Sequence, residues 1–233
     1  QLVNGAAKWH YMFGGQKSVP ITIRLIIGRG WGQGPTHSQS LQSWFAHIPG
    51  LKVVMPSNAY DAKGMLLSSI FDNNPVIFLE HRWLHNLEGH VPENDYRIKI
   101  GKAKNLIEGE DITIVSSSYM TIEAIHAAKY LIQFGIKCDL VDLRTIKPID
   151  WENVIKSIKK TGRLLVIDSG FSFGSIASEI ISTVTENNFN DLKCAPVKMA
   201  MPDVPEPTSI ALTKGFYIRA KDIINRVGKI LNL

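Results

Sequence analysis

Cysteine is scarce in this sequence of 233 residues, which contains Cys138 and Cys194 and no C-x-x-C pair. A disulfide scaffold or a zinc ribbon needs several closely spaced cysteines, so both are excluded and a reducing cytoplasm is the expected location. Long apolar runs are missing as well, and none reaches the ~18–20 residues that cross a bilayer. The first residues lack a basic stretch followed by an apolar run, so no secretion signal is expected.

Clustered charge of one sign is also missing. Lysine and arginine number 26 against 21 acidic residues, which gives a formal net charge of +5, and the two signs are interspersed. This pattern is typical of a solvated surface, so we expect neither nucleic acid nor a membrane as a partner. Hydrophobic residues make up 45% of the chain, which is enough to bury a core in one large or two small domains.

Short apolar segments alternate with helical patterns along most of the chain. Runs bounded by Pro or Gly predict strands at 21–27, 51–55, 75–79, 112–117, 137–143, 163–168 and 197–201. Apolar residues at helical spacing predict helices at 38–47, 57–71, 121–134, 150–160, 175–186 and 221–231. The alternation predicts an α/β fold with two consecutive parallel-sheet domains.

The periodicity fails between His81 and Gly101, which predicts a domain boundary there. We expect a first domain at 1–90, a linker at 91–110 and a second domain at 111–233. The first domain contributes only three of the predicted strands, whereas an open sheet usually has about four to six. Either the chain is a fragment, or another polypeptide completes this sheet.

Two motifs point to chemistry that their context argues against. Residues 170–174 match G-x-S-x-G between a strand and a helix, but all seven histidines precede Ser172, the wrong order for that hydrolase fold. A tight turn into a helix capped by Ser172 or Ser175 is favoured instead. His81 and His85 have metal-ligand spacing for a helix, but their segment lacks a helical pattern, which favours a surface or interface pair.

A glycine-rich segment is the better candidate for a ligand site. Four glycines lie within residues 28–34, directly after a predicted strand. The segment is neither G-x-G-x-x-G nor a P-loop, but ligand sites form at the carboxyl ends of parallel strands. His37 follows at the start of the helix predicted for 38–47. There the positive helix end would keep its imidazole neutral, suited to accept or relay a proton.

The segments GPTHSQ at 34–39 and IPGLKVV at 48–54 make the sequence familiar. The chain resembles the transketolase-like thiamine diphosphate enzymes. Within them it is most similar to the β subunit of the decarboxylating first component of 2-oxo acid dehydrogenase complexes of pyruvate, branched-chain or acetoin type. Further matching segments occur in the same order at 6–16, 61–64, 72–80, 100–103, 143–148 and 203–205.

The resemblance implies that 1–90 is the back portion of a pyrimidine-binding domain and that the remainder is a transketolase C-terminal domain. It implies oxidative decarboxylation of a 2-oxo acid with acyl transfer to lipoamide, with His37 as the catalytic histidine. Thiamine diphosphate would be shared with an α subunit, which would also hold the magnesium. The expected assembly is a heterotetramer, in which the chain also contacts a second β-type subunit. A lipoyl acyltransferase core is a further partner that the resemblance implies.

Some β subunits of this family hold a structural potassium ion through oxygen ligands. The matching positions here are Ile21, Ser69, Ile70, Asp72 and Asn74. Oxygen donors suit a hard cation. The segment 72–75 is equally typical of a plain turn, and both interpretations stay open.

The chain departs from the family pattern in two ways. The glutamate that activates the cofactor lies upstream of the histidine in this family, whereas no glutamate precedes Glu80 here. We therefore assign no cofactor-binding residue and expect the isolated chain to be inactive. Cys194 stands where an acidic residue is expected to dock the acyltransferase core. Two alternatives follow, a split transketolase-like enzyme that transfers a two-carbon unit and a non-catalytic assembly module.

Overall fold

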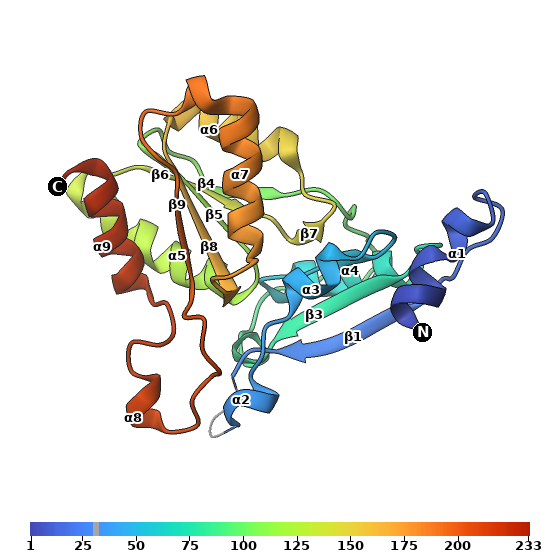
Figure 1. Cartoon of the computed structure of the whole chain (residues 1–233). Coiled ribbons are helices and arrows are strands. Elements are labelled where there is room, and N and C mark those ends of the chain that lie inside the picture. Colours follow the sequence, from blue (N-terminus) through green and yellow to red (C-terminus); the bar gives the residue numbers. More distant parts are fainter. Residues whose placement is uncertain (30–32) are drawn as a thin grey trace.

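The computed structural model describes residues 1–29 and 33–233, whose strands form two sheets (Figure 1). The first sheet has the order β1-β3-β2-β7 and the second has the order β4-β6-β5-β8-β9. The strand bounds are β1 (Thr22–Ile27), β2 (Lys52–Val54), β3 (Val76–His81), β4 (Lys104–Ile107), β5 (Ile112–Ser116), β6 (Cys138–Asp142), β7 (Thr145–Lys147), β8 (Leu164–Phe171) and β9 (Val197–Met201). Among the described strands, β4 pairs antiparallel with β6 and β7 pairs antiparallel with β2, and the other pairs are parallel. The predicted α/β class with mostly parallel sheets is therefore confirmed.

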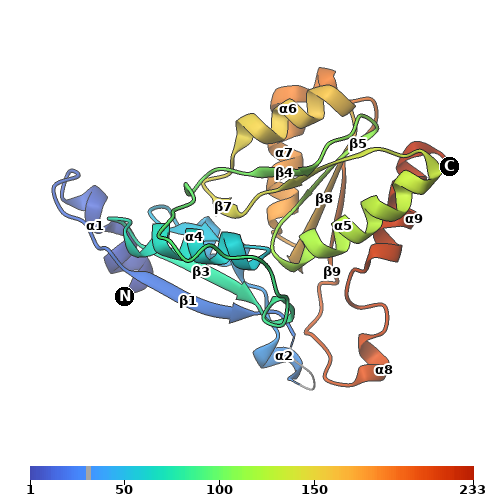
Figure 2. The same cartoon turned by 180° about the vertical axis from the view of Figure 1, so that it is seen from behind.

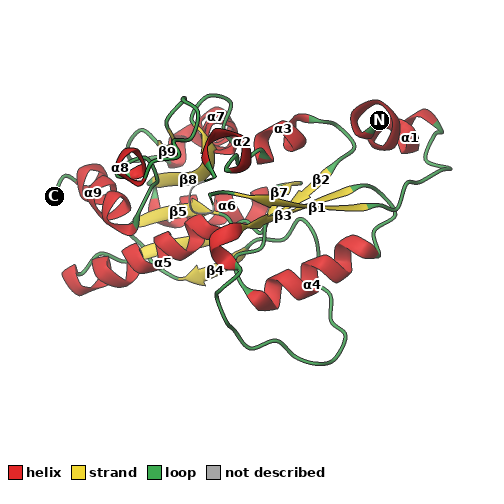
Figure 3. Ribbon diagram, turned by 90° about the horizontal axis from the view of Figure 1, so that it is seen from below, coloured by secondary structure: helices red, strands yellow, loops and turns green. Residues whose placement is uncertain are grey.

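Helices cover both faces of each sheet. Their bounds are α1 (Ala7–Met12), α2 (Gly34–His37), α3 (Gln42–His47), α4 (Ala59–Ile70), α5 (Tyr119–Leu131), α6 (Trp151–Thr161), α7 (Ile176–Asn188), α8 (Ile210–Thr213) and α9 (Ala220–Leu231). In the first sheet α3 and α4 lie on opposite faces (Figure 3). No helix in the described part of the chain is long and apolar enough to cross a membrane.

Strand β5 shows why the strands of the second sheet are apolar on both sides. Ile112 and Ile114 pack in the core that α5 and α9 cover, whereas Val115 packs in the core that α6 and α7 cover. Figure 2 shows α5 and α9 on the same side of this sheet. Successive side chains of a strand point to opposite faces, so a strand covered on both faces is a continuous apolar run.

Local capping sets the ends of several helices. The Asn58 side chain accepts a hydrogen bond from the Asp61 amide at 2.8 Å, and the Ser175 hydroxyl accepts one from the Ser178 amide at 3.2 Å. Such bonds satisfy amides that the first helical turn leaves unpaired. The G-x-S-x-G segment is therefore the end of β8 and a turn into α7, with Ser175 rather than Ser172 as the cap.

The helix predicted for 38–47 is wrong in its first four residues, because α3 begins only at Gln42. Ser38 and Ser40 are buried, and the Gly28 amide donates a hydrogen bond to the Gln39 carbonyl at 3.4 Å. This contact with the end of β1 competes with helical hydrogen bonding in the segment. As a result His37 ends the one-turn helix α2 instead of standing before α3.

Two short strands escaped prediction from the sequence. β4 pairs antiparallel with β6 and is partly exposed, and β7 pairs antiparallel with β2. Strand β7 comes from the C-terminal half of the chain but belongs to the first sheet. The count of three strands in the first sheet is therefore corrected to four, since a later segment of the same chain supplies β7.

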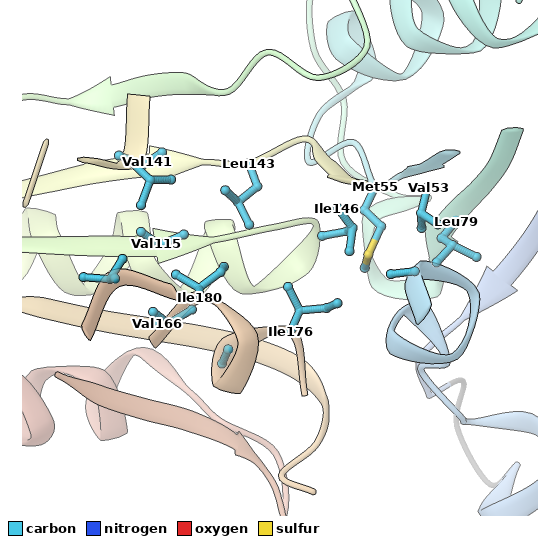
Figure 4. Packing of buried hydrophobic residues seen from close by; sticks show 14 of the residues in the cluster. Val53, Met55, Leu79, Val115, Val141, Leu143, Ile146, Val166, Ile176 and Ile180 are labelled. Carbon is cyan, nitrogen blue, oxygen red and sulfur yellow. The ribbon is translucent and has the colours of Figure 1, made fainter. Parts of the chain in front are cut away.

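The two sheets share one hydrophobic core. Met55 follows β2 and packs in the same cluster as Ile146 of β7 and Ile176 of α7 (Figure 4). Nearby, the Arg144 guanidinium lies 3.1 Å from the buried Asp61 carboxylate, and the Arg144 carbonyl accepts a hydrogen bond from the Met55 amide at 2.7 Å. Apolar packing and a buried ion pair thus join the halves of the chain.

Candidate functional site

The carboxyl ends of β1 and β3 meet at one edge of the first sheet. β1 leads through Gly28 and Arg29 toward α2, while β3 ends at His81. Residues 30–32 of the glycine-rich segment lie outside the described residues, but Gly28 and Gly34 lie within them. The structure therefore confirms that this segment leaves the carboxyl end of a parallel strand, where ligands bind in open α/β sheets.

The surroundings of His37 differ from those predicted from the sequence. His37 is exposed and is the last residue of α2, so it does not stand at the start of α3, which begins at Gln42. The prediction that His37 begins the helix of residues 38–47 is therefore wrong. The imidazole is instead open to solvent, which leaves it accessible to a substrate or to a second protein surface.

His81 is a buried partner of the same edge. Its side chain is only 4% exposed, and burial lowers its pKa to about 3, with smaller contributions from His85, Arg219 and Arg82. Its Nδ1 accepts a hydrogen bond from the Trp83 amide at 3.2 Å, and its ring stacks on Tyr119 at 5.1 Å. A neutral, packed imidazole of this kind is structural.

A shared metal site for His81 and His85 finds no support in this geometry. The intervening residues 82–84 form a 3-10 turn, and His85 is exposed while His81 is buried. Among the residues that the structure describes, no group of three or more His, Cys, Asp and Glu side chains could hold a metal ion.

The residues matched to a potassium site gather at the opposite edge of the first sheet, where β1 and β3 begin and α4 ends. The Ile21 carbonyl accepts a hydrogen bond from the Val76 amide at 3.0 Å, and the Ser69 carbonyl accepts one from the Asp72 amide at 3.2 Å. Each carbonyl oxygen has two lone pairs, so each could also bind a cation. Ile70 ends α4 beside them.

Asp72 and Asn74 also form the turn that the sequence favours. Asp72 Oδ1 accepts a hydrogen bond from the Asn74 amide at 2.9 Å, and Asp72 Oδ2 lies 2.5 Å from Lys52 Nζ. The turn is thus observed, and the Lys52 ammonium pairs with the carboxylate that was matched to the cation.

The structure also shows two buried polar pairs that the sequence did not single out, and the first of them joins the halves of the chain. The Gln42 amide group donates to Asp168 Oδ1 at 2.5 Å, while its own oxygen is buried without a hydrogen-bond partner among the described residues. Glu206 is 3% exposed and accepts a hydrogen bond from the Tyr217 hydroxyl at 2.5 Å, and burial raises the pKa of this carboxyl. Gln42 and Asp168 are 126 positions apart, which hides their contact from an analysis of local sequence patterns.

Two cavities lie away from His37. One of about 470 Å³ lies between α3, β7 and the start of α7, with His47, Lys147 and Ile176 in its lining. Another, of about 340 Å³, is lined by Cys194 together with Arg226 and Lys229 among others. The residue expected to be acidic is thus a thiol in a basic setting.

Comparisons with known proteins agree with this two-part architecture. The family model for the transketolase pyrimidine binding domain matches residues 2–86, and the model for the transketolase C-terminal domain matches residues 101–223. A solved structure described as a split gene transketolase, inactive beta4 tetramer, superposes with a TM-score of 0.76 at 25% identity, covering 93% of this chain and 68% of that chain.

The relatives found by sequence belong to a more specific class of protein than the two family models define. The chain is 43% identical to the pyruvate dehydrogenase E1 component subunit beta of Rickettsia bellii over 98% of its own length and 70% of the relative's. It is 44% identical to the acetoin:2,6-dichlorophenolindophenol oxidoreductase subunit beta of Cupriavidus necator over 91% of its own length, but spans only 63% of that relative. The chain belongs to the transketolase family. Within that family it groups with the β subunits of dehydrogenases of this kind.

Proposed function

We propose that the chain forms the β-subunit half of a thiamine diphosphate site in a 2-oxo acid dehydrogenase. The reaction is oxidative decarboxylation of a 2-oxo acid with acyl transfer to lipoamide. The observation that carries the proposal is the exposed His37 at the carboxyl edge of the first sheet, in a chain whose relatives include a pyruvate dehydrogenase β subunit. We propose residues 1–90 and 111–233 as the main parts of the two domains, with 91–110 between them. Two short strands cross these bounds, because β4 within 91–110 pairs in the second sheet and β7 within 111–233 pairs in the first.

In this proposal His37 holds or moves a proton where the acyl group meets its lipoyl acceptor. An imidazole suits this role because it can donate or accept near neutral pH. Thiamine diphosphate, when bound, supplies the electron sink that allows a 2-oxo acid to lose carbon dioxide.

The remaining parts of the site come from an α subunit. We infer from the family resemblance that this subunit holds the magnesium and the diphosphate. Residues 1–36 of the given sequence contain no glutamate, so no residue among them is assigned to the aminopyrimidine. We propose a cytoplasmic heterotetramer in which two β-type chains and two α subunits complete the sites.

A turnover assay of the full-length protein with its α subunit tests the role of His37. We expect His37→Ala to lower lipoamide-dependent turnover by about 100-fold or more, the usual contribution of a general acid–base group. His47→Ala is a matched control, because His47 is also exposed and also ends a short helix. Unchanged turnover in the His37 variant would remove this residue from the mechanism.

A second candidate is a split transketolase-like enzyme, which the superposition on the split gene transketolase favours. It would transfer a two-carbon unit to an aldehyde acceptor. Parallel assays with aldose acceptors and with lipoamide separate the two activities. Product formation with the aldose alone would replace the dehydrogenase assignment with this one.

We also propose a potassium ion at the corner formed by Ile21, Ser69, Ile70, Asp72 and Asn74. A ligand that binds only the folded state raises the unfolding temperature. The thermal midpoint should therefore be higher in potassium chloride than in choline chloride at equal ionic strength. Asp72→Asn should abolish this difference, whereas Asp95→Asn in an exposed loop should keep it. Equal midpoints in the two salts for the unchanged protein would contradict the site.

A further inference from the structure

Residues 202–215, called the arm below, reach from the second sheet to the edge that carries α2. The arm follows β9, contains α8 and leads into α9. In both Figure 1 and Figure 2, α8 and α2 lie at the same end of the molecule. The contacts between the arm and the residues before His37 show how the two are joined.

Arg29 binds the arm at both ends of α8. Its Nη1 donates to the Thr213 hydroxyl at 3.1 Å, and its Nη2 donates to the Thr208 carbonyl at 3.2 Å. The guanidinium carbon also lies 5.8 Å from the centre of the Tyr217 ring. A planar guanidinium can span two acceptors in a fixed geometry, which a single ammonium cannot do.

The Thr208 side chain lies directly against the start of α2. A Cβ atom built on Gly34 would stand 2.3 Å from Thr208 Oγ1, and the backbone of Gly34 has φ +64°. Gly34 is the first residue of α2, and His37 is the last. The Thr208 side chain therefore contacts the one-turn helix that carries the imidazole.

The base of the arm is fixed to the second domain. Glu206 is buried against the Tyr217 hydroxyl, and Phe216, Tyr217 and Ile218 pack in the core under α5 and α9. Because a packed core anchors the arm, the arm contacts α2 from a fixed position rather than as a free loop.

We propose that Arg29 and Thr208 are positioning residues that hold α2, and with it His37, in the orientation needed for catalysis. The proposal rests on the proposed role of His37. Arg29 ties together the two ends of α8 within the arm, and Thr208 sets the distance between the arm and Gly34. The imidazole orientation of the first domain is then set by a segment of the second.

Steady-state kinetics of the full-length protein with its α subunit tests the positioning. Arg29→Ala and Thr208→Gly should each lower kcat by about tenfold or more, because small displacements of a reacting group are costly. The KM for the 2-oxo acid and the affinity for thiamine diphosphate should stay within about twofold. Arg29→Lys should not restore kcat, and Lys214→Ala, an exposed change on the same arm, should leave it unchanged.

A complementary pair of changes isolates the contact itself. Gly34→Ala should lower kcat because its Cβ meets Thr208 Oγ1. Combining it with Thr208→Gly should regain a large part of kcat, since the new methyl group fills the vacated space. The backbone strain at Gly34 is present in both variants, so strain alone predicts no recovery. A double variant as inactive as the worse single variant would overturn the proposal.

Hydrogen exchange gives a readout that does not depend on turnover. The amides of Gly34 and Thr36 should exchange faster in Arg29→Ala and Thr208→Gly than in the unchanged protein, and at the unchanged rate in His37→Ala. If His37→Ala keeps full turnover while these exchange rates rise, the assigned role of His37 fails but the arm does hold α2. If His37→Ala is inactive while Arg29→Ala and Thr208→Gly match the unchanged protein in kcat and exchange, the positioning proposal is wrong.

Discussion

Single residues carry most of the proposed chemistry, and they differ in how visible they are from the sequence. His37 could be identified because it lies in a compact motif, GPTHSQ, that resembles a known family. Arg29 and Thr208 could not, because their hydrogen bond joins positions 179 residues apart. Periodicity and motif spacing describe local order, whereas such a contact exists only after the two domains have packed.

At the residue scale, His81 predicts a measurable pH dependence of stability. Its pKa falls from 6.5 in the unfolded chain to about 3 in the folded protein, because burial disfavours the charged form. The unfolded state therefore binds the proton more readily, and stability decreases as the pH falls from about 6.5 toward 3. The slope from this group approaches about 1.4 kcal/mol per pH unit.

Chemical denaturation of the full-length protein between pH 7 and pH 4.5 measures this contribution. His81→Gln keeps a hydrogen-bond acceptor for the Trp83 amide but does not titrate, so its stability should fall less steeply than that of the unchanged protein. His90→Gln, an exposed change in the same loop, should keep the original slope. Parallel slopes for all three proteins would show that His81 is not the source.

At the scale of elements, the sequence predicts those that have a long period or a clear end. The sequence pattern predicts five helices close to their observed positions, because each has apolar residues at helical spacing. These are α4, α5, α6, α7 and α9. β7 has only three residues, and half-exposed β4 has a weak pattern. The start of α3 was misplaced because a tertiary hydrogen bond to Gln39 replaces helical bonding there.

The start of α4 offers a test of a predicted helix end. Asn58 Oδ1 accepts the Asp61 amide hydrogen at 2.8 Å, so Asn58→Ala should lower the free energy of unfolding by about 1 kcal/mol. Asn58→Ser should retain most of that stability, because serine also caps helices well. Urea denaturation measures both changes. Equal losses for the alanine and serine variants would mean that the capping bond is not the stabilising contact.

At the scale of the whole molecule, one shared core joins the two sheets. Met55 is fully buried where they meet and packs in a cluster with residues of both domains. Met55→Ala should cost about 2–5 kcal/mol, the usual range for deleting a buried side chain of this size. The loss should appear in a single transition for both domains, because the change weakens packing common to them.

Two spectroscopic probes during denaturation distinguish shared from separate unfolding. Far-ultraviolet circular dichroism follows all helices, and tryptophan fluorescence includes Trp9 and Trp44 of the first domain and Trp151 of the second. Coincident curves for the unchanged protein and for Met55→Ala are expected. Two separated transitions, with only one shifted by the substitution, would contradict a common core.

Strand β7 has a consequence for how the polypeptide matures during translation. Its residues 145–147 leave the ribosome after the other strands of the first sheet, β1, β2 and β3, have already been made. Until they arrive, β2 presents an unpaired edge, the kind of surface that recruits foreign strands. Nascent chains halted before this point should therefore depend on chaperones, and release from that dependence should coincide with the emergence of Lys147.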